Sequence, residues 1–560
     1  MLERSYKRHF FGRHGLIIPL ITLACLLPFA NKAFHIDDPI FIWVARHIFT
    51  NPVDFYGFTA NWYGLEEPMS SILINPPGLS YYIALTAAIT GWSELSLHLS
   101  LFIPAIGMSY GTYCLARQTG IKSPWLAALI VVFSPVFLLC STNIMADLMM
   151  SALYVWAVIF WLDGLEKKRL SYLFLSSLLI SISALTKYFG ITLVPLLLAF
   201  SLLSKKKLSA HTFILMIPVV ILFFYEWLTY MLYGKGLLSY AAHYATEVSS
   251  IVKPGLMTNL LTGLSFSGGS LLSTAFFIPL LWSKKIWVIW GLVLLSVATL
   301  LLQTGYLGSL SLYDEKGIKW SSIVQCTLFI AAGIHIIVLA VDNALRSKDA
   351  ISLLLFFWVI GTFIYLSLIN WTISARTVLP MAPAVGVLLA RRFDQLQSRA
   401  LEKNLMWRAT FPLFLGAIVA FLVSWADYSL ANCQRTAVRT IYSDFKDSKN
   451  TLWFQGHWGF QYYMEAAGGK PLDFKSSSIK YGDIVTIPVN NTNKKRLSND
   501  DFQYVRSLQI MPSQWIGTMQ SSTGAGFYAA AIGPLPFTIG NIQPEEYLLY
   551  SAKKDVKGIL

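Results

Sequence analysis

Two adjacent carboxylates, Asp37 and Asp38, directly follow an apolar run that is long enough to cross a membrane. A carboxylate in this position can accept a proton from a hydroxyl group as a general base. Like charges at this spacing raise the pKa of one of the two acids, and a divalent cation relieves their repulsion. The stretch FHIDDP therefore predicts proton-transfer chemistry where the chain leaves the bilayer.

Other ionisable residues border apolar runs: Asp147 in NIMADLMM, Lys187 in ALTKYFG and Arg376 in SARTVLP. Charges beside hydrocarbon are costly and are usually paired or functional. A lysine or arginine can stabilise the charge that develops on a phosphate leaving group. A carboxylate base together with such cations predicts the transfer of a sugar from a lipid phosphate.

The first loop also contains Glu66 and Glu67, which are candidate ligands for a divalent cation. A plainer interpretation is that they are solvated loop charges, and the sequence favours neither interpretation over the other. The position of any single basic residue is also explained by snorkelling, in which a long side chain extends to the membrane surface and keeps its charge in water. The functional interpretation depends on all these charges sharing one membrane face.

Composition fixes the class of protein. Of the 560 residues, 55% are hydrophobic and only 13% are charged, with a mean hydropathy of +0.56, whereas soluble proteins have about 25% charged residues. The chain is therefore predicted to be a polytopic α-helical membrane protein in contact with membrane lipids. Its net charge of +14 lies in short basic clusters between apolar stretches, as topology signals do, which excludes nucleic acid as a partner.

The positive-inside rule predicts about thirteen spans that start from a cytoplasmic N-terminus. Residues 75–91 are expected to form a juxtamembrane or re-entrant outer helix that begins at Pro77, because a full span there would reverse every later loop. This topology places all the candidate site residues on the outer face. The predicted spans are 15–33, 95–116, 124–142, 145–165, two within 170–204, 210–232, 265–282, 285–304, 320–341, 350–370, 376–390 and 408–427.

The character of the chain changes after Trp425. Segments such as TLWFQG and GDIVTIPV show alternating residue patterns and lie between turns rich in Gly and Asn, which is typical of strands. We therefore expect a transmembrane catalytic domain over 1–430 and a small soluble α/β domain over 431–560. An odd number of spans places the second domain outside, periplasmic or extracellular, and the short cytoplasmic loops fit a bacterial inner membrane.

Five motifs occur in order along the chain: FHIDDP, INPPGLSYYIAL, MADLMMSALYVW, ALTKYFGITLVPLLL and SARTVLPMAPAVGVLLARR. In this order they resemble the GT-C-fold glycosyltransferases of the protein O-mannosyltransferase and aminoarabinose-transferase superfamily, over about residues 15–430. The resemblance implies an inverting glycosyltransferase that uses a polyprenyl-phosphate sugar donor on the non-cytoplasmic face. The acceptor would be a hydroxyl or phosphate of a lipid, a glycan or a protein.

The resemblance also assigns roles to residues. It implies catalytic carboxylates at Asp37, Asp38 and Asp147, and donor-phosphate ligands at Lys187 and Arg376. Asn75 stands where many aminoarabinose transferases have the lysine of a Lys-Pro-Pro motif, and it retains a hydrogen-bond donor without the positive charge. No cofactor is certain, and a divalent cation is the one candidate.

Two other functions compete with this interpretation. A transporter or flippase of a lipid-linked saccharide would also need many spans and outer charges, but transporters more often show internal repeats and charges near the midplane. A non-catalytic receptor would use the outer domain, and it leaves the clustered acids and cations unexplained.

Overall fold

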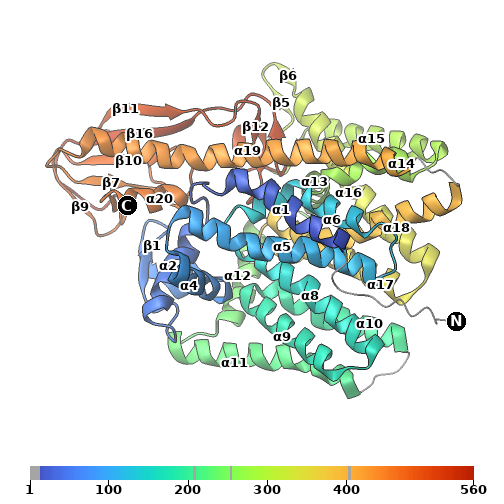
Figure 1. Cartoon of the computed structure of the whole chain (residues 1–560). Coiled ribbons are helices and arrows are strands. Elements are labelled where there is room, and N and C mark those ends of the chain that lie inside the picture. Colours follow the sequence, from blue (N-terminus) through green and yellow to red (C-terminus); the bar gives the residue numbers. More distant parts are fainter. Residues whose placement is uncertain (1–12, 206–209, 253–254, 401–404, 560) are drawn as a thin grey trace.

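The computed structural model describes residues 13–205, 210–252, 255–400 and 405–559. A bundle of long helices occupies most of the molecule, and a sheet-containing domain lies at one end of it (Figure 1). The described N-terminal residues lie at the opposite end of the bundle from this domain.

Each of the thirteen predicted spans falls on a helix or on a pair of helices. Among the described residues, seven helices are long and apolar enough to cross a membrane, or up to nine if each bent pair is one span. The number of spans therefore stays a prediction. The bundle helices are α1 (Ile17–Leu26), α5 (Glu94–Gln118), α8 (Ala146–Lys167), α9 (Leu170–Thr186), α10 (Leu193–Lys205), α11 (Met216–Tyr233), α15 (Lys284–Thr304), α16 (Trp320–Ser347), α17 (Ala350–Ile364), α18 (Ala382–Ala400) and α19 (Leu405–Phe445).

Two further predicted spans are broken helices. Helices α6 (Pro124–Val132) and α7 (Pro135–Ser141) meet at 65°, because Pro135 cannot continue α6 and Ser134 starts α7 by accepting a hydrogen bond from the backbone of Phe137. Helix α13 (Leu256–Ser270) meets a second helical segment, Leu272–Leu281, at 75°.

Three short helices lie at the end of the bundle nearest the sheet domain: α2 (Asp38–Thr50), α4 (Gly78–Thr90) and α12 (Leu237–Val252) (Figure 1). Helix α4 has Pro77 at its N-cap, which confirms a helix in the predicted outer segment. Its 13 residues span about 20 Å, less than the ~30 Å hydrocarbon core. Helices α1 and α10 are no longer than α4 and belong to predicted spans, so the place of α4 relative to the membrane stays a prediction.

The C-terminal region contains a five-stranded mixed sheet in the order β11-β16-β10-β7-β8. Strand β10 pairs parallel with β7, while β16 is antiparallel to β10 and β11. Helix α19 continues past the predicted boundary at residue 431, so that the sheet begins only after it ends. The elements are β7 (Leu452–Phe454), α20 (Trp458–Ala466), β8 (Lys470–Pro471), β10 (Ile484–Pro488), β11 (Phe502–Ile510) and β16 (Glu545–Ala552).

One stretch of the C-terminal region packs into the bundle, and we call residues 516–543 the insertion segment. Its apolar side chains share one buried core with the bundle helices, and the Phe537 ring lies 4.9 Å from that of Phe329 on α16. The backbone N–H of Ala375 donates to Phe527 O at 2.8 Å, and that of Ala530 donates to Ile373 O at 2.8 Å. The insertion segment is thereby fixed to the chain just before Arg376.

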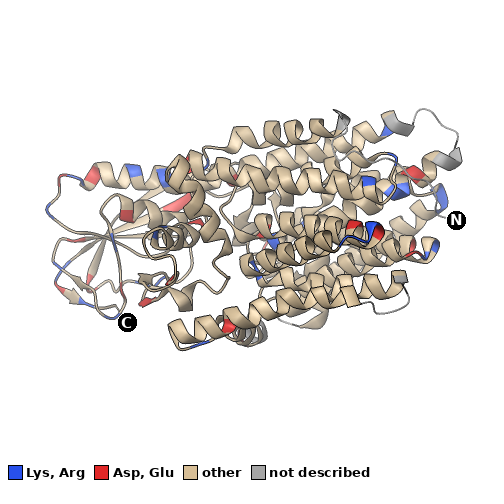
Figure 2. Cartoon of the chain, turned by 60° about the horizontal axis from the view of Figure 1, so that its bottom comes forward, with Lys and Arg blue, Asp and Glu red and all other residues tan. Residues whose placement is uncertain are grey.

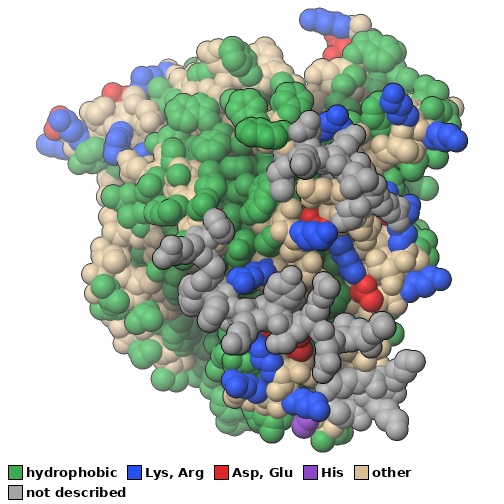
Figure 3. All heavy atoms as spheres, turned by 45° about the vertical axis from the view of Figure 1, so that its right-hand side comes forward, with side chains coloured by type: hydrophobic (Ala, Val, Ile, Leu, Met, Phe, Trp, Pro, Cys, Tyr) green, Lys and Arg blue, Asp and Glu red, His purple; other side chains and the backbone are tan. Residues whose placement is uncertain are grey.

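Charged side chains gather at the two ends of the molecule. Figure 2 shows Lys and Arg at the end of the bundle opposite the sheet domain and on the sheet domain itself, with few charges between them. Figure 3 looks toward this end of the bundle. Several basic side chains lie on the face turned forward, and hydrophobic side chains cover the side of the bundle. This distribution agrees with the predicted alternation of basic loops.

Candidate functional site

A cavity of ≈ 150 Å³, which we call the outer pocket, brings together four of the sequence-predicted residues: Asp37, Asn75, Lys187 and Arg376. They come from the turn before α2, the turn before α4, the end of α9 and the short helix Ala375–Met381. The remaining lining residues are Ile74, Tyr188, Phe189, Ala241, Tyr244, Ala245, Tyr365, Asn370, Trp371, Thr372, Ser374 and Thr377.

Asp37 and Arg376 form an ion pair in the outer pocket. Arg376 Nη1 donates to Asp37 Oδ2 at 3.2 Å, and both side chains are partly accessible, with exposures of 15% for Arg376 and 31% for Asp37. The same Nη1 lies 2.9 Å from Met145 Sδ. Arg376 Nε is buried and has no hydrogen-bond partner in the described part of the chain. The exposed part of this guanidinium lines the pocket, where it could donate to an anion.

Lys187 and Asp147 form a second pair. Lys187 Nζ lies 2.5 Å from Asp147 Oδ1. Lys187 ends α9 with an extended backbone and lines the pocket, whereas Asp147, in the first turn of α8, is 3% exposed behind it. The structure therefore places Asp147 next to a pocket cation and not in the pocket lining itself.

Asp38 lies apart from its neighbour Asp37. Its carboxylate is fully buried and accepts the backbone N–H groups of His35 and Ile144, each at 2.8 Å. Burial raises the pKa of Asp38 to about 7, against these two hydrogen bonds and the charge of Lys32, which act to lower it. Asp38 is not part of the pocket lining, so the predicted acidic pair is split between the pocket and the protein core.

Glu66 and Glu67 also lie away from the outer pocket. They belong to β2 (Glu66–Pro68), where Glu66 accepts a hydrogen bond from Thr59 at 2.6 Å and its N–H donates to Asp473 at 2.9 Å. In the described part of the chain, no group of three or more His, Cys, Asp or Glu residues could hold a metal ion. The predicted metal ligands therefore find no third partner there.

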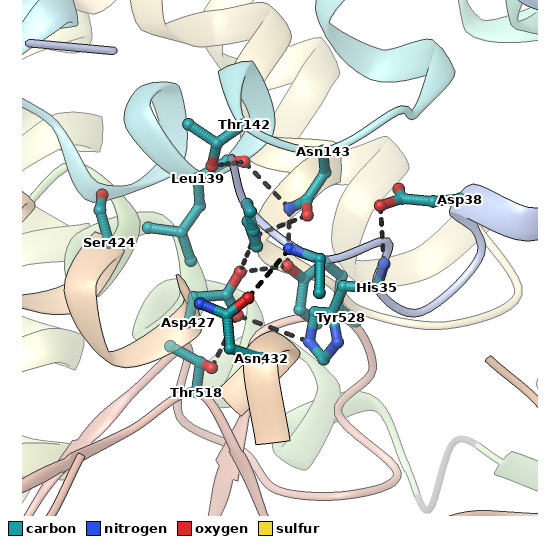
Figure 4. A network of polar contacts seen from close by, with 12 residues as sticks. His35, Asp38, Leu139, Thr142, Asn143, Ser424, Asp427, Asn432, Thr518 and Tyr528 are labelled. Carbon is teal, nitrogen blue, oxygen red and sulfur yellow. Dashed lines mark hydrogen bonds and ion pairs between the residues drawn. The ribbon is translucent and has the colours of Figure 1, made fainter. Parts of the chain in front are cut away.

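Sequence reasoning missed a buried ionic network under the pocket. Lys32 Nζ lies 2.5 Å from Asp427 Oδ2, with both side chains at most 1% exposed, and Asp427 also accepts the hydroxyl of Tyr528 at 2.7 Å (Figure 4). The signal was present, because Lys32 ends one apolar run and Asp427 ends another.

The sequence of residues 75–230 matches the family model for dolichyl-phosphate-mannose-protein mannosyltransferases. This match confirms the predicted resemblance over the segment that contains Asn75, Asp147 and Lys187. A search of curated proteins found no significant match.

Several solved structures are similar to this chain. An Archaeoglobus fulgidus oligosaccharyltransferase tethered with an acceptor peptide is 16% identical, with a TM-score of 0.44, and the match covers 83% of this chain but only 64% of that one, just under two thirds of its length. AglB from Archaeoglobus fulgidus, in complex with an inhibitory peptide and a dolichol-phosphate, is 15% identical, with 85% and 69% covered and a TM-score of 0.48. ArnT from Cupriavidus metallidurans bound to undecaprenyl phosphate is 12% identical, with 85% and 93% covered and a TM-score of 0.44.

Proposed function

We propose that this chain is an inverting glycosyltransferase with the GT-C fold. In this proposal it moves a sugar from a polyprenyl-phosphate donor to an acceptor hydroxyl or phosphate at the extracytoplasmic membrane face. The observation that carries the proposal is the outer pocket, in which the Asp37 carboxylate lies beside two cations, Lys187 and Arg376. The family matched over residues 75–230 is named for a dolichyl-phosphate sugar, which agrees with this class of donor.

The donor phosphate would bind between Lys187 and Arg376. Lys187 offers an ammonium that is 18% exposed, and Arg376 offers the 15% of its side chain that is exposed. Asn75 adds a neutral hydrogen-bond donor to the same lining. A charge-assisted contact from each cation would also stabilise the charge that grows on the phosphate as it leaves.

Asp37 would act as the general base. As an acceptor oxygen bonds to the anomeric carbon of the sugar, its proton passes to the Asp37 carboxylate. The bond from the anomeric carbon to the phosphate oxygen breaks on the opposite face, and its electron pair leaves with the polyprenyl phosphate. This single displacement inverts the anomeric configuration, and the acceptor is a lipid, a glycan or a protein.

Asp147 and Asp38 would support the site from behind. Asp147 holds the Lys187 ammonium at the pocket wall, while Asp38 ties the turn before α2 to Ile144, in the turn before α8. Asp37 is the one acid among the described residues that line the pocket, too few ligands for a metal site made by the protein. No step of the transfer is therefore assigned to a metal ion.

The enzyme would be a multi-pass protein of a bacterial inner membrane, with a cytoplasmic N-terminus and a periplasmic or extracellular C-terminal domain. The basic bundle end and the sheet domain lie at opposite ends of the molecule, which supports this orientation (Figure 2). We also propose a division into a catalytic domain, 1–430, and an outer domain, 431–560, of which the insertion segment packs against the first.

The test is a transfer assay with purified protein in proteoliposomes. A polyprenyl phosphate carrying a radiolabelled sugar is added together with a membrane extract as the acceptor source. We expect labelled acceptor and free polyprenyl phosphate to form together. Movement of the intact donor across the bilayer without transfer would instead identify a flippase.

A further inference from the structure

The insertion segment brings a tyrosine from the C-terminal region under the pocket arginine. The guanidinium carbon of Arg376 lies 5.6 Å from the centre of the Tyr528 ring, within the range of a cation–π contact. Two backbone hydrogen bonds, from Ala375 to Phe527 and from Ala530 to Ile373, flank this contact. The position of Tyr528 is therefore coupled to the backbone that carries Arg376.

The hydroxyl of Tyr528 is held at a fixed place. It donates to Asp427 Oδ2 at 2.7 Å and accepts from Asn143 Nδ2 at 2.6 Å. The ring is 2% exposed, and the His35 ring meets it edge-on with centroids 5.5 Å apart. Figure 4 shows the hydroxyl between the Asn143 and Asp427 side chains, so that the side chain cannot move away without breaking both hydrogen bonds.

Asp427, which accepts the hydrogen bond from this hydroxyl, has partners for both of its carboxylate oxygens. Asp427 Oδ1 accepts the Thr518 hydroxyl at 2.8 Å (Figure 4). Lys32 Nζ lies 2.5 Å from Asp427 Oδ2 and 2.7 Å from Asn143 Oδ1. The network joins the end of the first apolar run, the turn before α8, helix α19 and the insertion segment. Buried ion pairs contribute little net stability, but they can fix one arrangement of the groups around them.

We infer that Tyr528 is a positioning residue for Arg376. The C-terminal region thus supplies the surface that aims the guanidinium at the outer pocket, and the Lys32–Asp427 pair holds that surface in place. The identity of the ligand as a polyprenyl phosphate rests on the proposed function. The restraint of Arg376 by Tyr528 does not.

The first experiment measures the restraint directly. Purified wild type, Tyr528→Phe and Tyr528→Leu are treated with phenylglyoxal, and the modification rate of each arginine is followed by peptide mass spectrometry. Phe keeps the ring but loses both hydroxyl bonds, whereas Leu loses the ring as well. We expect Arg376 to react about 2-fold faster in the Phe variant and about 10-fold faster in the Leu variant.

Arg435 is the internal control, because its side chain is also 15% exposed and pairs with Glu94 away from Tyr528. Its rate should not change. An unchanged Arg376 rate in the folded Phe variant overturns the inference, whatever the Leu variant does. The Phe variant also decides the matter alone if the Leu variant does not fold.

The second experiment measures binding of undecaprenyl phosphate by the same proteins, with Tyr547→Leu as a matched control. Tyr547 is another buried tyrosine, 1% exposed, but it packs in the core of the sheet domain against Phe460. We expect Tyr528→Leu to raise the Kd about 10-fold and Tyr547→Leu to lower only the thermal stability. Equal effects of the two substitutions on Kd would indicate a purely structural role and overturn the inference.

A double-variant cycle separates this inference from the proposed function. In an Arg376→Ala background, Tyr528→Leu should have no further effect on Kd, because its partner is gone. A full additional loss would mean that Tyr528 does not act through Arg376. If wild type does not bind undecaprenyl phosphate at all, the proposed donor class fails, and the phenylglyoxal rates still decide whether Tyr528 restrains Arg376.

Discussion

Asp37 and Arg376 are 339 positions apart in the chain, yet Arg376 Nη1 lies 3.2 Å from Asp37 Oδ2 in the outer pocket. The pair places the proposed base, Asp37, next to the proposed phosphate ligand, Arg376. In a glycosyl transfer from a lipid phosphate, the attacking oxygen and the leaving oxygen lie on opposite faces of one carbon. The ion pair must therefore part when the donor binds, so that the sugar carbon lies between the base and the phosphate ligand.

Asp37→Asn tests the base. Asparagine keeps the size and one acceptor of the side chain but cannot take up the proton, so sugar transfer should fall about 10²–10⁴-fold while the Kd for the donor stays close to wild type. Transfer rates per folded protein and donor binding give the two numbers. Asp314→Asn, on the exposed hairpin between α15 and α16, is the control and should be fully active. Wild-type turnover in Asp37→Asn would remove it as the base.

Replacement of the pocket cations should weaken donor binding. Lys187→Ala and Arg376→Ala each lose a charge-assisted contact worth about 1.5–3 kcal/mol, so the Kd for polyprenyl phosphate should rise roughly 10- to 100-fold. Binding titrations at low and high salt measure this. Arg346→Ala removes an exposed arginine that pairs with Asp342 on α16, and it should bind normally. Normal donor binding by both pocket variants would mean that Lys187 and Arg376 do not bind the phosphate and only extend toward the membrane surface.

The sequence predicted the charged residues of the pocket because charges stand out in an apolar chain. Asp37, Lys187 and Arg376 each border an apolar run, and the positive-inside rule places all three on one face. The helices also follow from sequence, since long apolar runs leave no alternative structure in a membrane. The sequence therefore predicts that Asp37 and Arg376 lie on the same membrane face, but it does not predict that they form an ion pair.

Other features depend on tertiary packing that no local pattern encodes. Asp37 and Asp38 are the same residue type in adjacent positions, and only the left-handed turn at Ile36 and the start of α2 decide which one faces the pocket. Tyr528 lies in a stretch that resembles an ordinary loop of the outer domain. Its approach to Arg376 follows from backbone pairing with residues 373–375, which long-range contacts alone determine.

Asp147→Asn separates a positioning acid from a second catalytic acid. The buried carboxylate balances Lys187, so its loss should lower the unfolding temperature and weaken donor binding by about 1–3 kcal/mol. The double variant Asp147→Asn/Lys187→Met removes both charges and should recover thermal stability but not donor binding. A large loss of turnover with unchanged donor affinity in Asp147→Asn would instead indicate a direct catalytic role.

The orientation is testable on the full chain with single introduced cysteines. The five native cysteines are all buried, so they should react little with a maleimide that cannot cross membranes. In intact cells, Ser448→Cys, in the exposed turn after α19, should be labelled, whereas Lys348→Cys, between α16 and α17, should be labelled only after lysis. The reverse pattern would invert the topology and put the outer pocket in the cytoplasm.

Asp38 should make stability depend on pH. Burial raises its folded-state pKa to about 7, above the ~4 of an unfolded aspartate, so the folded protein binds the extra proton between these values. The stability that the protonated Asp38 side chain contributes is therefore fully present below about pH 4, and it is lost as the pH rises through about 7.

The variant Asp38→Asn carries an amide that does not titrate. The stability advantage of wild type over this variant, measured by thermal unfolding, should therefore shrink between about pH 5 and 7, at about 1.4 kcal/mol per pH unit at most, and level off above that range. Asp314→Asn should show no such trend. A constant difference between wild type and Asp38→Asn across this range would mean that Asp38 is already ionised in the folded protein at about pH 5.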